Sequence, residues 1–581
     1  MSVTIRQRHG RPPFVLHRLS REPNRATTPV IRHDGLFDIF PESYWARFTA
    51  LESVSLRCHL RAPARLRLLR RRLDDVGGEA LLAETSWSPG TETDEVELSA
   101  SLAPADGPDS CLLLEIIPTG PHTDPVISAA WESAQAPERT PRIGVVITTF
   151  NREPFLVSNL ARLHRHMAGG CAVVVNHGEP GLEQRLRGQV PTDPAIRWID
   201  QENSGGAGGF TRGMVEHHAA GDITHVLLMD DDIDMPDDLV ERTAAILSFA
   251  RPEICLGGAM FDYHARTQLF SAGDMLLPGS FGIGHVVPPD GCDIATAAGV
   301  DFLARVHRPD FNGWWCFAFP IEALEQVGLP MPCFIRGDDV EFGYRLKRAG
   351  MPTLGWPGLA VWHMPFAGKS APWHMFYDRR NSLFANALHR RIGRLKAVGK
   401  LVGGFTHHLL RYDYDRVRAM TFGIAAFNAG PAAMACWTHR EHAQLIAATS
   451  AMALASDEAD GGKASSALTL PPIRLSGFAR SLRMVGRLVL DLCGLPVGRA
   501  TPYVLPHGDH WRPDYTQRPS LVIEQDGNGG TARVYRRDPA ESRRAMLRCL
   551  RAMTGMLVRF HQDVPQAALG TTLGVTATSA H

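Results

Sequence analysis

Three consecutive carboxylates, Asp230, Asp231 and Asp232, directly follow the apolar residues 226–229. An uninterrupted apolar run of this length is typical of a strand that is buried on both faces, as in a parallel sheet. Asp230 and Asp232 are two residues apart, so their side chains leave an extended chain on the same side. Two such carboxylates can share a hard divalent cation such as Mg²⁺ or Mn²⁺, because these ions prefer oxygen ligands. The alternative interpretation is an acidic turn that continues as far as Asp238.

Other residues that could take part in chemistry stand further along the chain. Asp338 and Asp339 precede a predicted helix, and because capping needs only one acid the pair leaves one carboxylate for chemistry. Trp314 and Trp315 belong to an aromatic cluster of a kind usually found in a core, although one of two adjacent rings could form a wall for a sugar ring. His363 follows a predicted strand, where a lone histidine is more often structural than a ligand.

Alternating strands and helices are predicted around these residues. Strands are expected at residues 143–150, 171–176, 196–200 and 225–230, and helices at 152–165 and around 213–218. This alternation is typical of βαβ units with a parallel sheet. Ligands of such sheets bind at the carboxyl ends of the strands. We therefore expect an α/β domain with its site at that edge.

A glycine-rich stretch, residues 203–212, enters one of the predicted helices with the sequence Asn-Ser-Gly-Gly-Ala-Gly-Gly-Phe-Thr-Arg. Its glycines allow close backbone approach, and a helix N-terminus can accept an anion. The stretch is not a G-x-G-x-x-G motif after the first strand, and no complete G-x-x-x-x-G-K-[ST] motif occurs in the chain. Neither the Rossmann fingerprint nor a P-loop is therefore supported.

Composition and charge narrow the class of protein. A chain of 581 residues is too long for one core, so two to four domains are expected. The formal net charge is zero, so no overall field attracts nucleic acid. The ten cysteines include no C-x-x-C pair, which favours reduced thiols in a cytosolic protein. Residues 1–19 lack the apolar core of a signal peptide.

One uncharged segment, residues 419–437, is long enough to raise the question of a membrane span. Pro431 should break a helix in its middle, so a pair of buried helices is the favoured interpretation. No other span is predicted, and we expect any contact with a membrane to be peripheral.

The regions that flank the α/β pattern differ from it. Residues 1–138 contain short runs of alternating apolar and polar residues, which predict a small β-sandwich or barrel. Residues 121–141 are rich in Pro, Ala, Ser and Glu and predict a linker. The catalytic domain is expected at 139–390, followed by a mainly helical domain at 391–569 and a disordered tail at 570–581.

Two basic stretches have two interpretations each. Residues 61–72 hold six arginines, which predict either a solvated face of a strand or helix or a contact with an anionic surface. Residues 539–560 predict an amphipathic helix with arginines off its apolar face. That face is expected to contain Met546, Leu550, Met553 and Leu557. Such a helix either packs on the protein or lies on anionic lipid.

Short motifs occur in a recognisable order along the chain. They are Thr-Thr-Phe-Asn-Arg at 148–152, Asn-Ser-Gly-Gly at 203–206, Asp-x-Asp at 230–232, Gly-Asp-Asp at 337–339 and Trp-His at 362–363. Together they resemble the GT-A glycosyltransferases of family 2. Two further features narrow the resemblance: the adjacent Trp314 and Trp315, and the β-rich N-terminal region. With them, the chain resembles the polymerising galactofuranosyltransferases that build actinobacterial cell-wall galactan from UDP-galactofuranose.

On the donor side, the resemblance implies contacts to the uridine diphosphate from four residues: Thr149, Phe150, Arg152 and Asn203. Asp230 would bind the nucleotide-sugar side. It would also join Asp232 and His363 around a Mn²⁺ or Mg²⁺ ion, which would neutralise the developing charge of the departing diphosphate.

On the acceptor side, the resemblance implies that Asp339 is the catalytic base and that Asp338 holds acceptor hydroxyls. Trp314 and Trp315 would line the acceptor site. The chain departs from the family at Asp378-Arg-Arg-Asn, where another histidine is usual, so any second acceptor-side histidine is in doubt.

His374 is a candidate for that missing histidine. The resemblance also implies an inverting displacement, a lipid-linked polysaccharide acceptor, a homo-oligomer and peripheral attachment at the cytoplasmic face of the membrane.

Three functions stay open on the sequence. They are the galactofuranosyltransferase, another family 2 polysaccharide transferase such as a rhamnosyltransferase, and a non-catalytic carbohydrate-binding scaffold. The complete set Asp230, Asp232, Asp339 and His363 argues against the scaffold. The adjacent tryptophans favour the first function over the second.

Overall fold

The computed structural model of the chain divides into two compact units. Unit 1 comprises Met1–Leu277, Ile283–Pro330 and Asp339–Phe366, and unit 2 comprises Pro278–Gly282, Met331–Asp338 and Ala367–His581. The residues whose structure is described are 13–19, 25–27, 30–74, 78–89, 94–120, 125–167, 169–279, 282–364, 371–450, 477–493, 503–505, 521–525 and 531–559. The predicted tail at 570–581 lies outside them, and the predicted boundaries at 138 and 390 stay predictions.

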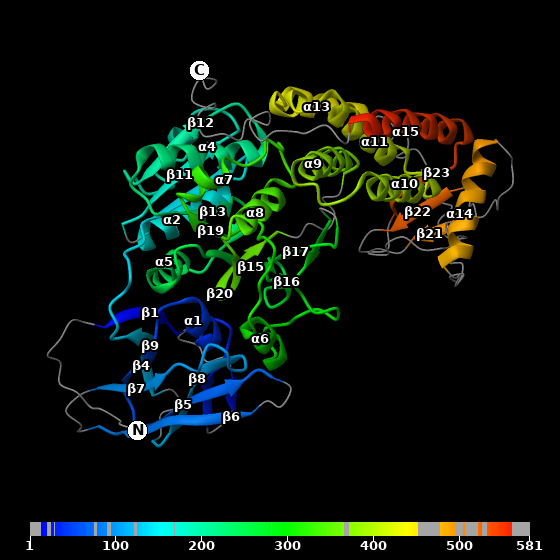
Figure 1. Ribbon diagram of the computed structural model, residues 1–581. Helices are drawn as coiled ribbons and strands as arrows, with labels where there is room; N and C mark the ends of the chain where they lie inside the picture. The colour runs from blue at the N-terminus through cyan, green and yellow to red at the C-terminus, as the bar shows by residue number, and fades with distance from the viewer. Residues whose placement is uncertain are drawn as a thin grey trace. The chain divides into compact units, whose positions relative to one another are not determined.

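Two antiparallel sheets form the N-terminal part of unit 1 (Figure 1). One has the strand order β1-β9-β4-β7, and the other has the order β2-β3-β8-β5-β6. The strands are β1 Phe14–Arg18, β2 Arg25–Thr27, β3 Val30–His33, β4 Ser53–Leu60, β5 Ala64–Arg72, β6 Glu79–Trp87, β7 Glu95–Ser101, β8 Ser110–Pro118 and β9 Val126–Ser133. The predicted β-rich character is present. The strand order gives two separate sheets and does not show the predicted barrel.

Strand β9 corrects the prediction of a linker at residues 121–141. It pairs with β1 on one side and with β4 on the other, so it is an inner strand of its sheet. Ala129 and Trp131 are buried at alternate positions, and Glu132 accepts a hydrogen bond of 2.7 Å from Arg57. The Ser, Ala and Glu content of this segment therefore reflects one polar face of a strand and not an unstructured connection.

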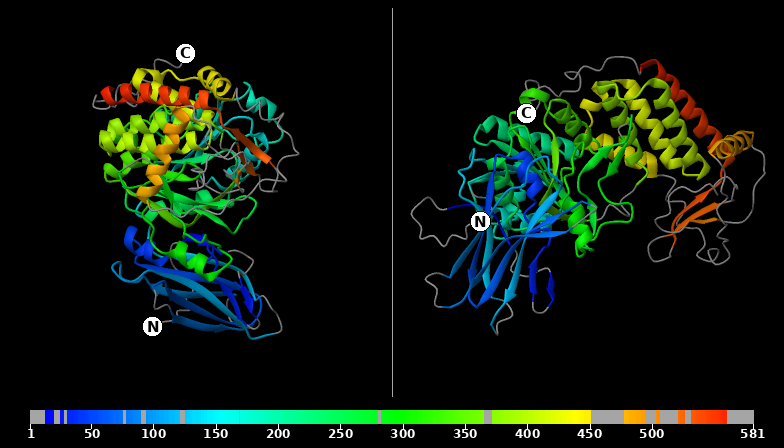
Figure 2. Two further views of the ribbon diagram at one scale, coloured as in Figure 1. Left: turned by 90° about the vertical axis from the view of Figure 1, so that its right-hand side faces the viewer. Right: turned by 60° about the horizontal axis from the view of Figure 1, so that its bottom comes forward.

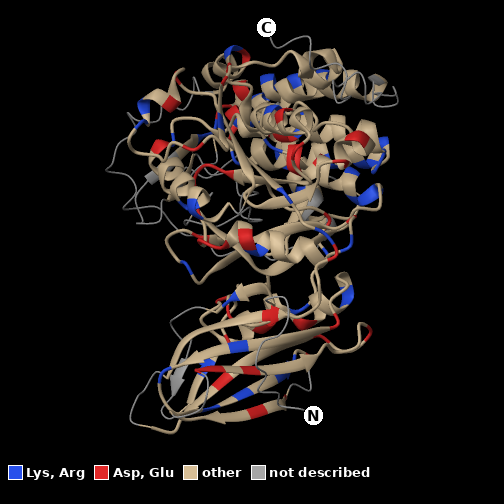
Figure 3. Ribbon diagram, turned by 90° about the vertical axis from the view of Figure 1, so that its left-hand side faces the viewer, with Lys and Arg blue, Asp and Glu red and all other residues tan. Residues whose placement is uncertain are grey.

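Most of the arginine-rich residues 61–72 lie in β5 (Ala64–Arg72), and several of their side chains meet acids on neighbouring elements. Arg67 donates to Glu115 at 3.2 Å, and Arg70 donates to Glu42 at 2.6 Å. Figure 3 shows basic and acidic residues interleaved over these strands. The strand part of the first interpretation is present, but its arginines are mostly half-buried rather than solvated, and carboxylates of the protein pair with Arg67 and Arg70.

The N-terminal sheets share a hydrophobic core with the central sheet of unit 1. Helix α1 (Glu42–Phe48) lies in this core, and its Tyr44 and Trp45 both contact Trp356 of the central sheet, with ring centroids 5.2 and 5.4 Å apart. Aromatic contacts of this kind bury large apolar areas. The N-terminal region is therefore joined to the region of the central sheet by core packing.

The central sheet has the strand order β12-β11-β10-β13-β19-β15-β20-β14, with β16 paired to β15 (Figure 1). The strands are β10 Ile143–Thr149, β11 Cys171–Asn176, β12 Ile196–Asp200, β13 His225–Asp230, β14 Ile233–Asp234, β15 Cys255–Asp262, β16 Leu269–Ser271, β19 Phe317–Pro320 and β20 Thr353–His363. Strands β12, β11, β10 and β13 are parallel, as predicted. Strand β19 is antiparallel to both β13 and β15, so the whole sheet is mixed.

The remaining elements of this region connect or cover the central sheet. The helices are α2 Glu153–His166, α3 Leu182–Arg185, α4 Gly205–Ala220, α5 Leu239–Phe249, α6 Ala297–Ala304, α7 Ala323–Val327 and α8 Asp338–Arg348. A two-stranded sheet pairs β17 (Asp274–Leu276) with β18 (Ile283–His285). Strand β10 has β11 on one side and β13 on the other, so the chain reverses its direction of winding between β10 and β13. Open α/β sheets bind ligands outside the carboxyl ends of the strands at such a point.

The glycines of α4 let this helix lie close to β10. A Cβ atom on Gly209 would stand 1.8 Å from Thr148 Oγ1, and one on Gly213 would stand 2.2 Å from Val146 Cγ1. No side chain fits at these distances, so both positions require glycine for close packing. The glycine-rich sequence thus has a packing role in the second and third turns of the helix.

Unit 2 contains the helical part of the chain (Figure 2). Its helices are α9 His374–His389, α10 Arg394–Leu410, α11 Tyr414–Ala429, α12 Ala432–Ala435, α13 His439–Ser450, α14 Gly477–Leu492 and α15 Pro539–Arg559. A small sheet joins β21 (Tyr503–Leu505), β22 (Leu521–Gln525) and β23 (Thr531–Arg536). The mainly helical character predicted for this region is present.

The predicted break within the uncharged residues 419–437 is present between α11 and α12, but α12 has only four residues, of which Met434 alone is buried, so the predicted pair of buried helices is not. Helix α11 ends at Ala429, and Gly430 follows with a φ of 100°, a conformation that favours glycine. Among the described residues, no helix combines the length and the apolar character needed to cross a membrane.

Helix α15 is amphipathic, but its buried face differs from the predicted one. Ala545, Cys549 and Met556 are buried, whereas Leu550 is 56% exposed. Asn428 of α11 donates a hydrogen bond to Ala552 O at 3.0 Å, which holds the two helices together. The buried positions are therefore each one residue before a predicted one. The small side chains of Ala545 and Cys549 face inward because they allow close contact between α15 and α11, and the larger side chains do not decide the orientation.

Candidate active site

Asp230, Asp232 and His363 form a compact cluster at the carboxyl edge of the central sheet. His363 Nε2 lies 2.9 Å from Asp232 Oδ1 and 3.6 Å from Asp230 Oδ2. One potential ligand atom of each residue lies within 4.8 Å of the others. The short strand β14 produces this meeting, because Ile233 pairs with His363 at the end of β20. The predicted Asp-x-Asp and Trp-His motifs are thus brought together although they are far apart in the sequence.

The imidazole of His363 is oriented by a backbone carbonyl. Its Nδ1 lies 2.7 Å from Met364 O, so Nδ1 carries the hydrogen and Nε2 faces the two carboxylates. Metal-binding histidines in proteins usually have such a partner on the second ring nitrogen. Burial would lower the pKa of His363, but hydrogen bonds and the charges of Asp230 and Asp232 raise it to about 10. A divalent cation would compensate the same negative charge that otherwise holds this proton.

Asp231 points to the other side of the chain and links this cluster to β10. Its carboxylate accepts a hydrogen bond of 3.3 Å from Phe150 N. Burial raises the pKa of Asp231 to about 7, and the neighbouring Asp232 and Asp230 add to the increase against an opposing hydrogen bond from Thr149. Sequence reasoning did not assign a role to this middle acid. The alternation of side chains along the strand is the signal that separates it from its neighbours.

The predicted donor-binding residues lie at the same edge, at the end of β10 or on the loops that follow β10 and β12. Thr149 ends β10 and is buried, and the neighbouring Thr148 is opposite Asp230 across the parallel pair. Phe150 is 47% exposed, and Arg152 is exposed directly before α2. Their roles toward a nucleotide stay predictions.

Asn203 shapes the entry to helix α4. Its side-chain oxygen accepts a hydrogen bond of 2.9 Å from Gly205 N, a local turn that brings the chain into the helix. The loop follows the end of β12 and precedes α4, so it lies at the carboxyl end of the parallel strands. The structure therefore explains a conformational role for Asn203, and contact with a nucleotide stays a prediction.

Trp314 and Trp315 point in different directions and are both almost completely buried. Trp315 donates Nε1–H to Gly258 O at 2.9 Å, so its polar atom is used inside the sheet. The ring of Trp314 contacts Phe210 of α4 and Phe342 of α8, with centroids 5.1 and 6.1 Å away. Its buried Nε1–H finds no hydrogen-bond partner among the described residues. A buried donor of this kind costs about 1–3 kcal/mol unless water or a ligand satisfies it.

The strand register places both tryptophans at the candidate site's edge. Strand β19 runs antiparallel to β13, with Phe317 opposite Leu228. The residues that precede Phe317 therefore continue toward Asp230 at the carboxyl end of β13. Of the two, Trp314 is the one whose ring nitrogen is available for a polar group outside the sheet.

Helix α8 begins with the acid pair Asp338 and Asp339. Asp338 is buried, and Asp339 is half-buried, with its carboxylate accepting a hydrogen bond of 2.7 Å from Val340 N. We expected the acid without a backbone partner to be the base, and this contact removes that reason for choosing Asp339. Its greater exposure still favours it as the acid that a substrate hydroxyl can reach.

A buried ion pair fixes α8 one turn further on. Glu341 is fully buried and lies 2.7 Å from Arg345, and Arg345 also donates to Leu329 O at 2.8 Å. Buried charges require such pairing and hydrogen bonding. Glu341 therefore anchors the helix that carries Asp339.

Arg380 and Asn381, where the sequence resemblance implies another histidine, support the loop before α8 within unit 2. Asn381 donates to Arg336 O at 2.7 Å, and the buried Arg380 donates to Cys333 O at 2.6 Å. Phe334 and Arg336 have φ values of 66° and 65°, which are unfavourable for residues other than glycine. Arg380 and Asn381 therefore hold a strained loop in place.

His374 lies at the start of α9, and its Nδ1 accepts a hydrogen bond of 3.1 Å from Ala371 N. Burial and the charge of Arg336 lower the pKa of His374 to about 4, so this imidazole is neutral at physiological pH. Its predicted role on the acceptor side stays a prediction.

Comparison with known proteins identifies the central region. Residues 141–381 match the sequence profile of the family described as "Glycosyltransferase like family 2". This segment is a family 2 glycosyltransferase-like domain. It contains the whole Asp230–Asp232–His363 cluster and the acid pair of α8, so the sequence resemblance to family 2 is confirmed.

Two curated relatives cover more of the chain. The galactofuranosyltransferase GlfT2 of Mycobacterium tuberculosis is 29% identical over 68% of this chain and 64% of its own length. GlfT2 of Mycolicibacterium smegmatis is 30% identical over 68% of this chain and 63% of its own length. The chain therefore resembles GlfT2, and the match spans less than two thirds of the length of these relatives.

The superposition of this chain on solved structures is weak. The mannosyltransferase PcManGT from Pyrobaculum calidifontis in complex with GDP-Man and Mn²⁺ is 17% identical, over 55% of this chain and 83% of that chain, with a TM-score of 0.32. This score is too low to support an inference about fold or function.

Proposed function

We propose that this chain is a metal-dependent, inverting glycosyltransferase that moves galactofuranose from UDP-galactofuranose to a growing, lipid-linked polysaccharide. The observation that carries the proposal is the meeting of Asp230, Asp232 and His363 at the carboxyl edge of a family 2 domain. Two carboxylates and an oriented imidazole fit Mn²⁺ or Mg²⁺. The resemblance to GlfT2 supports the choice of the sugar.

The donor would bind with its diphosphate beside this cluster. A bound cation would neutralise the negative charge that develops on the leaving diphosphate. Arg152, exposed at the start of α2, would add a fixed positive charge, and the loop of Asn203 would add polar contacts to the nucleotide. Thr149 and Phe150 would border the nucleotide at the end of β10.

The acceptor hydroxyl would attack the sugar from the side of helix α8. Asp339 would remove its proton, and Asp338 would hold a neighbouring hydroxyl. The attack forms the new glycosidic bond while the bond to the diphosphate breaks, and the proton passes to the Asp339 carboxylate. A single displacement inverts the anomeric centre, so an α-linked donor gives a β-linked product.

The unsatisfied Nε1–H of Trp314 supports an acceptor or sugar contact at the same edge. A hydroxyl oxygen of the carbohydrate would accept this hydrogen bond and remove the cost of burying the donor. Trp315 would contribute only packing, because its own donor is occupied by Gly258 O.

We also propose a homo-oligomer and a peripheral contact with the cytoplasmic face of the membrane. Helix α15 exposes Leu547, Leu550 and Val558, and its Arg544 and Arg551 are exposed too. Apolar and basic side chains on one helix suit a surface of anionic lipid. Reversing the charges of Arg544 and Arg551 should weaken binding to anionic vesicles, most clearly at low salt. Unchanged binding would assign the helix to packing within the protein.

A donor screen tests the proposed function. The purified protein with Mn²⁺ is given a panel of nucleotide sugars and a galactan-like acceptor, and release of the nucleotide diphosphate is measured with the product. We expect release from UDP-galactofuranose and none from an Asp232→Asn variant. Turnover of a nucleotide-linked rhamnose instead would identify the alternative transferase. Carbohydrate binding without turnover of any donor would favour the scaffold.

A further inference from the structure

A second cluster of potential metal ligands lies at the opposite edge of the same strands. Cys171, His217 and Asp222 each offer one ligand atom, and these atoms lie within 4.8 Å of one another. Cys171 begins β11, His217 is in the last turn of α4, and Asp222 directly follows the end of that helix. All three belong to unit 1. The cluster takes no part in the proposed transfer.

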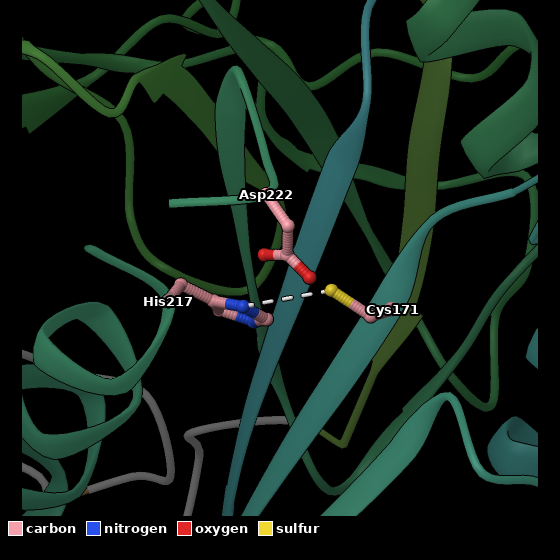
Figure 4. A group of neighbouring side chains, drawn as sticks. All are labelled: Cys171, His217 and Asp222. Atoms are coloured by element: carbon pink, nitrogen blue, oxygen red, sulfur yellow. Dashed lines mark hydrogen bonds between the residues drawn. The ribbon is translucent and has the colours of Figure 1, made fainter. Parts of the chain in front are cut away.

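The side chains face a common point (Figure 4). Cys171 Sγ lies 3.7 Å from His217 Nδ1. Ligand distances to zinc are about 2.3 Å for sulfur and about 2.0–2.1 Å for nitrogen, so two such ligands at a tetrahedral angle are about 3.5 Å apart. The observed separation is therefore close to the span that a zinc ion would bridge.

The imidazole of His217 is oriented as metal ligands usually are. Its Nε2 lies 3.0 Å from Val145 O, so Nε2 carries the hydrogen and the lone pair of Nδ1 faces the thiol. A backbone carbonyl on the second nitrogen fixes the tautomer and direction of a metal-binding histidine. The histidine is almost completely buried, so this orientation is not an accident of a mobile surface side chain.

Two glycines allow the cluster to form. A Cβ atom on Gly144 would stand 2.5 Å from Ile223 Cδ1 and 3.0 Å from both Cε1 and Nδ1 of His217, so a larger residue here would crowd Ile223 and press on the ring. Gly221 has a φ of 65° and ends α4, which turns the chain so that Asp222 returns toward the strand end. Asp222 is exposed, so the cluster is open to solvent and an ion could enter.

We propose that Cys171, His217 and Asp222 bind a borderline divalent cation, with zinc as the preferred ion. Thiolate and imidazole select zinc over magnesium or calcium, whereas the oxygen-rich cluster at the carboxyl edge suits harder ions. Binding replaces the S–H bond of Cys171 with a sulfur–metal bond and releases that proton to solvent. The thiolate and Asp222 then carry two negative charges, which balance the charge of the ion. A water molecule would complete four-coordination.

Burial and the nearby Asp222 raise the pKa of the Cys171 thiol to about 11, against smaller opposing contributions from Arg197 and Arg142. Glu216, which precedes His217, is itself paired with Arg212 at 2.8 Å. A bound cation would supply the positive charge that the thiolate needs at this half-buried position.

Cobalt titration of the full-length, reduced protein tests the proposal. Co²⁺ replaces Zn²⁺ in tetrahedral sites, and a thiolate ligand gives it a charge-transfer absorption in the near ultraviolet. The carboxyl-edge cluster contains no sulfur, so it cannot produce this band. We expect the wild type to show the band at one equivalent and zinc to displace it. Absence of the band would leave only a thiol–imidazole hydrogen bond and would overturn the proposal.

Variants assign the band to these residues. Cys171→Ser should remove it, whereas Cys436→Ser, at an exposed cysteine, should keep it. Asp222→Asn changes an exposed side chain and should weaken zinc binding by about 10–100-fold without unfolding the protein. Persistence of the band in Cys171→Ser, or unchanged zinc affinity in Asp222→Asn, would show that another site binds the ion.

Discussion

The two edges of the parallel strands carry clusters of different chemistry. At the carboxyl edge, two aspartates surround the oriented imidazole of His363, and at the amino edge a thiol, an imidazole and one carboxylate converge. Strand β10 lies between them: Gly144 is opposite Cys171, and Thr148 is opposite Asp230. Four residues of extended chain separate these levels by about 13 Å. The same strands can therefore support a hard site at one end and a soft site at the other.

The positions of the two clusters suit different roles, the carboxyl-edge cluster catalysis and the amino-edge cluster structural stability. Ligands outside the carboxyl ends lie at the winding reversal between β10 and β13, where a substrate can approach. Ligands at the amino edge join the end of α4 to the start of β11 and are positioned to stabilise the sheet rather than to meet a nucleotide. An ion at the first site should control activity, and an ion at the second should control stability.

The largest expected effect is the loss of transfer when the carboxyl-edge cluster is broken. Asp232→Ala, or EDTA, should reduce transfer by at least about 10³-fold, because a metal ion contributes several kcal/mol to stabilising the leaving charge. The measurement is release of the nucleotide diphosphate. Asp237→Ala is the matched control, since this acid is exposed and is paired with Arg162 at 3.2 Å.

Cys171→Ser should keep near wild-type transfer in the same assay. Loss of transfer in this variant would show that the amino-edge cluster also serves catalysis. Full activity of the wild type in chelator would remove the metal-dependent mechanism altogether.

The second effect concerns the acid pair of α8. Asp339→Asn retains the shape of the side chain but removes the base, so transfer should fall by about 10²–10⁴-fold. Donor binding should change little, because Arg152, Asn203 and the metal cluster remain. Single-turnover rates and nucleotide affinity measure the two quantities separately. A normal rate in Asp339→Asn together with a slow Asp338→Asn would reverse the assignment of the base.

Much of the carboxyl-edge site could be predicted from the sequence, for physical reasons. An apolar run that ends in polar residues identifies a buried strand and the edge of the sheet at which that strand ends. Asp230 and Asp232 lie on the same face because side chains alternate along a strand. The resemblance to family 2 added His363, which no local pattern connects with the aspartates. The pairing of β14 with β20, which makes the connection, depends on tertiary structure.

The amino-edge cluster could not be predicted in the same way. Cys171 and His217 are 46 positions apart, and the turn at Gly221 that returns Asp222 leaves no distinctive spacing. The glycines of α4 show a related difficulty. Sequence alone showed that these glycines allow close backbone approach but not to which element, whereas in the structure Gly209 and Gly213 are required by the proximity of β10.

The third prediction concerns the pH dependence of stability in the presence of chelator. It uses the pKa shifts of His363 and His217, which are opposite in direction. The carboxylates hold the pKa of His363 at about 10 despite burial, above the unfolded value near 6.5. Its contribution to stability is full below pH 6.5 and is lost as the pH rises toward 10. Burial lowers the pKa of His217, so its contribution is present above pH 6.5 and is lost as the pH falls.

Urea unfolding at about pH 5, 7 and 9 checks these signs. His363→Gln should flatten the decline in the free energy of unfolding between neutral and alkaline pH. His217→Gln should reduce the decline on the acid side, where the buried His177 and His225 also contribute because burial lowers the pKa of each to about 4. If His363→Gln changed the acid side of the pH profile instead, or His217→Gln the alkaline side, the protonation state assigned to that histidine would be wrong.

The smallest expected effect concerns helix α4, which connects the two edges: its entry loop contains Asn203, and its last turn contains His217. Gly213→Ala places a methyl group 2.2 Å from Val146 Cγ1, so the helix must move away from β10. Overpacking of this kind costs about 1–3 kcal/mol, measured as a lower midpoint of urea unfolding.

Gly206→Ala is the matched control in the same helix, because nothing lies within 4 Å of its added methyl group. It should be neutral or stabilise the protein by about 0.4–1 kcal/mol, since alanine restricts the unfolded chain. Because Gly213 is one turn from His217, Gly213→Ala should weaken zinc binding at the amino edge more than Mn²⁺ binding at the carboxyl edge. Equal losses at both sites would mean that α4 moves as a rigid body, and an unchanged zinc affinity would show that the position of His217 does not depend on this contact.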